Sequence, residues 1–138
     1  MTKELFINAA LQFLNTPYRW GGDDPSGIDC SGLVQEMLAM IGLDPKGDQT
    51  ADALYRHFRH FGNEGILGAG SLVFFGSEAK VTHVAIMLDE FTMLEAGGGG
   101  SRTKTTQDAW DQNAFVRLRP FNMRLDLVTV IQPHNLPF

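Results

Sequence analysis

The chain contains a single cysteine, Cys30, in a setting that favours reactivity. It follows Asp29 in the segment YRWGGDDPSGIDCSGL (18–33), where the aspartate can cap a helix that begins at the cysteine. The N-terminus of a helix stabilises the thiolate, which is the reactive form of cysteine. A free cysteine is more often a small buried apolar residue. A proton-accepting partner would decide between the two interpretations, because cysteine nucleophiles depend on one, usually histidine.

Four histidines are available as that partner. His57 and His60 lie three positions apart on a predicted helix, where flanking arginines favour a solvated face over a metal site. His134 lies in a proline-bounded tail. His83 interrupts the apolar run at 81–88, which is typical of a strand, and a polar residue there needs a hydrogen-bond partner. On this pattern alone, a buried histidine with a hydrogen-bond partner and a purely structural role is more common than a catalytic histidine.

The next predicted strand, residues 91–96, offers Glu95 as that hydrogen-bond partner. If the hairpin turn centres on Asp89, His83 and Glu95 are directly opposed on one face of the sheet. A two-residue turn would instead oppose His83 to Ala96 and direct Glu95 to the other face. The spacing leaves both registers open. In the first register we expect Glu95 to accept the Nδ1–H of His83.

The elements that must position these residues follow from the spacing of apolar side chains. Helices are predicted over residues 2–15, from 29 or 30 to 42, and over 50–61, and short strands over 72–75, 81–88, 91–96, 115–119 and 127–132. The stretch Gly21–Gly27 is expected to form turns without a regular element. Helices that precede strands predict an α+β fold, with helices packed on a mainly antiparallel sheet of about five strands.

Length and composition narrow the class of protein. The 138 residues, of which 43% are hydrophobic and 20% charged, predict one folded domain over 1–138. The net charge of −5 and the absence of a basic stripe argue against a nucleic-acid partner. No apolar run is long enough for a membrane helix, and the N-terminus is not a convincing secretory signal. We therefore expect a cytoplasmic protein as encoded, or one delivered by phage or secretion machinery.

Four segments, YRWGG, DCSG, SLVFFG and THVAIML, occur here in an order and spacing that resemble the NlpC family of cell-wall cysteine peptidases. The resemblance covers roughly residues 5–119 and implies a papain-like fold. It implies Cys30 as the nucleophile and His83 as the base, with Glu95 at the position of a third polar residue that is often histidine. This chemistry needs neither a metal ion nor an organic cofactor.

The resemblance also implies a substrate: the peptide stems of bacterial peptidoglycan, cleaved between D-glutamate and a diamino acid. Tyr18 is expected to line the active site and to assist the Cys30 N–H as an oxyanion hole. Asp29 and Ser31 are expected to hold the free amine of the substrate, although Asp29 has a competing role as helix cap. Trp20 is expected either to bind substrate or to pack against the second helix.

Two other functions stay open on the sequence. Papain-like folds also include amidases and acyltransferases that act on other amides. The domain would alternatively be a non-enzymatic component of a phage or secretion assembly, because a fold alone does not prescribe a function. The glycine run Gly97–Gly100 is interpreted as a mobile loop beside the active site rather than a phosphate-binding loop.

Overall fold

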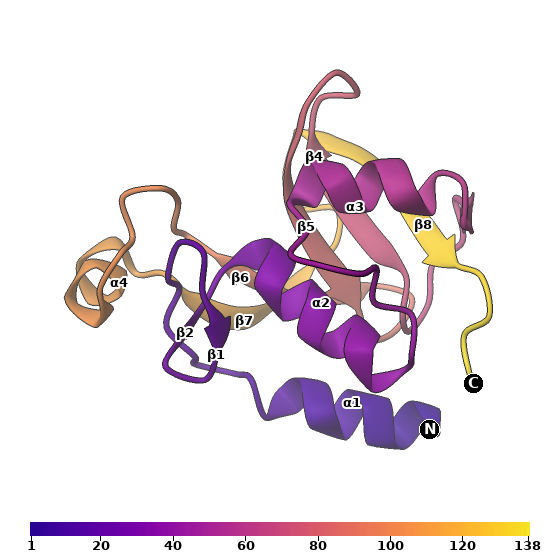
Figure 1. Ribbon diagram of the computed structural model, residues 1–138, viewed down its shortest axis with the longest axis horizontal. Helices are drawn as coiled ribbons and strands as arrows, with labels where there is room; N and C mark the ends of the chain where they lie inside the picture. The colour runs from indigo at the N-terminus through magenta and orange to yellow at the C-terminus, as the bar shows by residue number, and fades with distance from the viewer.

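The computed structural model describes residues 1–138 as helices packed against an antiparallel sheet, with a small separate hairpin (Figure 1). The helices are α1 (Lys3–Leu11), α2 (Cys30–Met40), α3 (Ala51–Phe58) and α4 (Thr106–Gln112). The strands are β1 (Asp23–Asp24), β2 (Gly27–Ile28), β3 (Gly62–Glu64), β4 (Leu72–Gly76), β5 (Val81–Met87), β6 (Thr92–Gly97), β7 (Phe115–Pro120) and β8 (Leu127–Pro133). The predicted α+β class is confirmed.

The main sheet has six strands in the order β3-β8-β4-β5-β6-β7, and every neighbouring pair is antiparallel. The five predicted strands are all present. The additional strand, β3, is short and exposed, so it carries no apolar signal that a sequence could reveal. No helix has the length and apolar composition that a bilayer crossing requires.

Helix α2 places Cys30 against the centre of the sheet. Its cap is Asp29, whose Oδ1 accepts the Gly32 N–H at 2.7 Å. Leu33 and Met37 are fully buried on its inner face, which packs against β5 and β6. In Figure 1, α2 and α3 lie on the same face of the sheet, with α1 beyond α2. The hydrophobic face of α2 therefore fixes where its N-terminus points.

Other predicted boundaries need correction. The first helix ends at Leu11, not at residue 15, and the chain turns back through Asn15 in the left-handed conformation, φ 70°. The prediction that residues 21–27 form only turns was wrong, because β1 and β2 pair there as a two-stranded hairpin. Its tight turn is stabilised by Asp24, which accepts the Ser26 N–H at 2.8 Å.

Candidate active site

Cys30 is the first residue of α2 and is 9% exposed. The first N–H groups of a helix have no partner within the helix, so they give this end a partial positive charge. The cysteine thus lies at a helix N-terminus, as predicted. The cysteine side chain lies close enough to His83 to raise the pKa of the histidine.

His83 and Glu95 meet between neighbouring strands of the sheet. The Nε2 of His83, on β5, lies 2.7 Å from Oε2 of Glu95, on β6, and both side chains are buried. The expected contact is present, but the expected atom was wrong: the carboxylate faces Nε2, not Nδ1. With Nε2 taken by Glu95, Nδ1 is the ring nitrogen that remains for the cysteine.

The hairpin that joins these strands adopts neither predicted register. The pairing of β5 with β6 centres on Glu90, and Asp89 organises the turn by accepting the N–H groups of the two residues after Glu90. Continued along the strands, this register opposes Glu95 to Ala85, so His83 is its diagonal neighbour on the same face. Diagonal neighbours are within reach of long side chains, which is why the contact survives the shift.

The two buried partners hold each other in the charged form. Burial lowers the pKa of His83, but hydrogen bonds to Cys30 and Glu95, together with their charges, outweigh it and raise this pKa to about 9. Burial raises the pKa of Glu95, but the hydrogen bond to His83 and the positive charges of His83 and Arg119 outweigh it and lower this pKa. His83 is therefore an imidazolium at neutral pH, which is the partner that a thiolate requires.

Tyr18 closes one side of the site. Its side chain is almost fully buried, and burial together with the negative charges of Cys30 and Asp29 raises the pKa of the phenol. The hydroxyl therefore keeps its proton and can donate a hydrogen bond. The glycine run 97–100 lies beside this ring, and a Cβ at Gly99 would clash with it. At this position the packing requires glycine.

The predicted amine-binding residues form the cap of α2. Asp29 is half-buried: its Oδ1 accepts from the Gly32 N–H at 2.7 Å and from Ser31 Oγ at 3.3 Å, and its Oδ2 accepts from the Gly21 N–H at 3.0 Å. Burial raises the pKa of Asp29 despite these bonds. Trp20 is 56% exposed, so much of its side chain is open to solvent.

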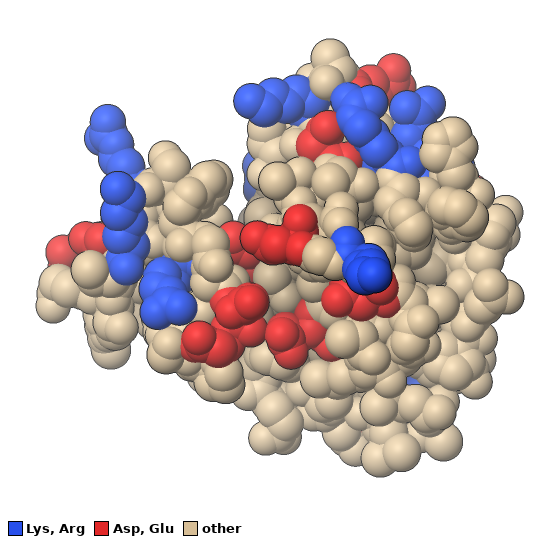
Figure 2. Space-filling model, viewed as in Figure 1, with Lys and Arg blue, Asp and Glu red and all other residues tan.

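An acidic hollow beside α2 was not anticipated. A cavity of about 200 Å³ is lined by carboxylates from three segments of the chain, namely Asp23, Glu36, Asp44 and Asp48. Figure 2 shows acidic side chains gathered across the middle of this face. Burial and the neighbouring carboxylates raise the pKa of Glu36. Because its members are scattered in sequence, no local motif signals the hollow.

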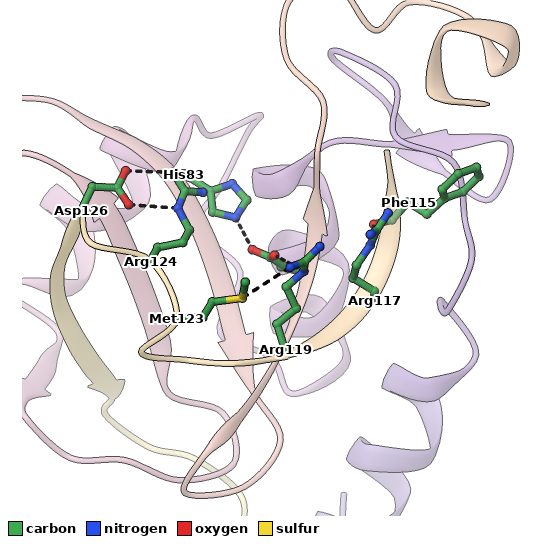
Figure 3. A network of polar contacts seen from close by, with 8 residues as sticks. His83, Phe115, Arg117, Arg119, Met123, Arg124 and Asp126 are labelled. Carbon is green, nitrogen blue, oxygen red and sulfur yellow. Dashed lines mark hydrogen bonds and ion pairs between the residues drawn. The ribbon is translucent and has the colours of Figure 1, made fainter. Parts of the chain in front are cut away.

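Arg119, on β7, is a second residue that the sequence did not single out. Its Nε lies 3.3 Å from Oε1 of Glu95 and its Nη1 contacts the sulfur of Met123 (Figure 3). Spacing alone does not reveal it, because two arginines on β7 project from the same face of the strand. The structure contains no group of three or more histidine, cysteine or carboxylate side chains arranged to hold a metal ion.

Comparison with known proteins places this site in a family. Residues 15–119 match the NlpC/P60 family. The bifunctional muramidase/DL-endopeptidase CwlT of Bacillus subtilis is 36% identical over 102 residues, covering 70% of this chain and 30% of CwlT. The murein DD-endopeptidase MepH of Escherichia coli is 30% identical over 115 residues, covering 78% of this chain and 42% of MepH. The chain thus spans less than half the length of either relative.

A solved structure shows the same fold. The crystal structure of the NlpC/p60 domain of the peptidoglycan hydrolase SagA superposes with a TM-score of 0.67 at 23% identity, covering 96% of this chain and 99% of that chain. The predicted papain-like fold and the predicted resemblance are both confirmed. The family match covers most of the chain and includes Cys30, His83 and Glu95, so the chain belongs to the NlpC/P60 family.

Proposed function

We propose that this chain is a cysteine hydrolase that cleaves amide bonds in the peptide stems of bacterial peptidoglycan. The observation that carries the proposal is the contact between a helix-terminal cysteine, Cys30, and a histidine that a buried carboxylate holds as imidazolium. Family membership and the names of the relatives, a DL-endopeptidase and a DD-endopeptidase, support the same reaction.

The geometry suggests how each group acts. The sulfur of Cys30 attacks the amide carbonyl carbon, and the charge on the oxygen is stabilised by the Cys30 N–H and the Tyr18 hydroxyl. The His83 imidazolium then gives its proton to the leaving nitrogen as the C–N bond breaks, which leaves a thioester on Cys30. Neutral His83 takes a proton from water as that water attacks the thioester. The free acid leaves and the thiolate–imidazolium pair is restored.

Charge around the site favours one end of a peptide substrate. Asp29 lies directly before the nucleophile, and the acidic hollow lies beside the same helix. A negative surface attracts an ammonium group, so we infer that the free amine of a stem peptide binds on this side, near Asp29 and Ser31. We place the cleaved bond between D-glutamate and the diamino acid. For intact cell wall as the substrate, which lies outside the cytoplasm, the protein would have to be exported or delivered.

The test is mass spectrometry of a panel of defined muropeptides after incubation with the protein. We expect two hydrolysis products whose masses place the cut after D-glutamate, and none with the Cys30→Ala variant. Products cut at another amide would overturn the assigned bond. Products that carry a transferred acyl group would identify an acyltransferase. No product from any muropeptide would overturn the assigned substrate class.

A further inference from the structure

Glu95 is a buried carboxylate shared by two cations. One oxygen, Oε2, faces Nε2 of His83 at 2.7 Å, and the other, Oε1, faces Nε of Arg119 at 3.3 Å. Figure 3 shows the side chains of His83 and Arg119, which come from the strands on either side of β6, with dashed lines marking both contacts. The side chain of Glu95 is 6% exposed, so water does little to screen either interaction.

The choice of arginine is specific. In the register of β6 with β7, Glu95 is opposed to Arg117, yet that side chain donates to the backbone carbonyls of Asn113, at 2.5 Å, and Phe115, at 3.4 Å. The diagonal neighbour Arg119 reaches the carboxylate instead. Its Nε is the only buried side-chain nitrogen or oxygen atom in the structure without a hydrogen-bond partner. The contact with Glu95 is therefore one of charge.

Two further charged groups act on this pair only through their charges: Arg124 lowers the pKa of Glu95 and His83 lowers the pKa of Asp126, while Arg124 and Asp126 hydrogen-bond each other. Arg124, on the loop between β7 and β8, makes two hydrogen bonds of 2.9 and 2.8 Å to Asp126 and stacks on Phe75, with 4.8 Å between the guanidinium carbon and the ring centroid. From α2, Cys30 raises the pKa of His83. Arg119 is thus the cation whose only carboxylate partner is Glu95.

We propose that Arg119 is a positioning residue of the active site, which acts on His83 by holding the second oxygen of Glu95 and sharing its charge. A carboxylate that serves two cations binds each less strongly than it would bind one alone. Arg119 therefore limits how tightly Glu95 holds the imidazolium, so that the proton remains transferable to the leaving amine. The inference rests on the proposed pairing of Cys30 with His83.

The test measures Cys30 alkylation by iodoacetamide across pH, using the full chain. This rate needs no substrate, and its basic inflection reports loss of the His83 proton. In Arg119→Met we expect the inflection to move upward by roughly half a pH unit, because one of the two cations that compete for Glu95 is gone. Glu95→Gln is expected to move it in the opposite direction. The matched control Arg117→Met, on the same strand face, is expected to leave it unchanged.

Arg119→Lys provides the charge-retaining comparison and should keep the inflection near that of the wild type. An unchanged or lowered inflection in folded Arg119→Met overturns the proposal, as does an equal shift in Arg119→Lys or Arg117→Met. If Arg119→Met does not fold, a shift in Arg119→Lys as large as that in Glu95→Gln overturns it.

With a cleavable muropeptide we expect Arg119→Met to lower kcat several-fold and leave KM nearly unchanged. A protein that alkylates as expected but cleaves no muropeptide refutes the proposed substrate and leaves this inference standing.

Discussion

At the level of single residues, Glu95 sets this site apart from a plain cysteine–histidine pair. A carboxylate hydrogen-bonds an imidazolium about twice as strongly as a neutral group does. Its contact with Nε2 leaves Nδ1 for Cys30, so the same ring is held from one side and reactive on the other. The strength of that hold sets the pH range over which the thiolate–imidazolium pair exists.

Replacement of Cys30 tests the nucleophile. We expect Cys30→Ala to abolish muropeptide cleavage without loss of the fold, because Leu33, Val34 and Met37 secure the buried face of α2. Cys30→Ser is expected to be nearly as inactive, since a serine hydroxyl is hardly ionised by His83. Product formation measured by mass spectrometry, with circular dichroism as the control for folding, checks both variants. Substantial activity in either folded variant would exclude Cys30 as the nucleophile.

Replacement of Glu95 by glutamine keeps the shape of the side chain and removes its charge. The pKa of His83, now about 9, should fall, because a hydrogen-bonded negative charge is lost. The basic limb of the kcat/KM profile should therefore move to lower pH, and kcat should fall several-fold. Steady-state kinetics across pH provide the measurement. A profile identical to that of the wild type would reduce the catalytic set to Cys30 and His83.

At the level of the elements, the sequence predicted those with a strong apolar period and missed those without one. Helix α2 and strands β4 to β8 were predicted because they bury one face or both. Helix α4 was missed because Ala109 is its only buried residue, although its capping box, Thr105 with Asp108, was available as a signal.

The residues of the candidate site also fall into those that the sequence predicts and those that it does not. Cys30, His83 and Glu95 were found by residue type and motif, while the acidic hollow and Arg119 depend on how distant segments pack. The hairpin register was not predictable, because Asp89 builds the turn through two side-chain hydrogen bonds that spacing does not reveal. Nor does strand register decide which arginine contacts Glu95, since the opposed residue is Arg117 and the contacting one is Arg119.

The cap of α2 allows a structural role to be separated from substrate binding. Asp29→Ala removes the acceptor of the Gly32 and Gly21 N–H groups and should destabilise the protein by about 1 kcal/mol. Asp29→Asn retains a good capping residue but removes the charge. If Asp29 binds an amine, Asn should raise KM for muropeptides with a free amino terminus but not for N-acetylated ones. Equal KM values for both substrate types would leave Asp29 with the capping role alone.

At the level of the whole molecule, the charge on His83 in the active site contributes to the free energy of folding. His83 and Glu95 lie on neighbouring strands, so the charge that prepares the histidine for catalysis also links β5 to β6. The pKa of His83, about 9 in the folded protein, exceeds the ordinary histidine pKa of 6.5. The folded state therefore binds this proton more tightly than the unfolded chain does, and folding is coupled to pH.

The sign of that coupling gives a stability prediction. A raised histidine pKa stabilises the fold fully below pH 6.5, and this contribution is lost as pH rises toward 9. The melting temperature of the wild type should therefore exceed that of Glu95→Gln by several degrees near pH 6, and the gap should narrow steadily toward pH 9.5. Arg117→Gln, which leaves the His83–Glu95 contact intact, should show a gap independent of pH. Calorimetry across this range is the measurement, and a wild-type advantage that stays constant or grows with pH would show that the Glu95 contact does not stabilise the His83 imidazolium.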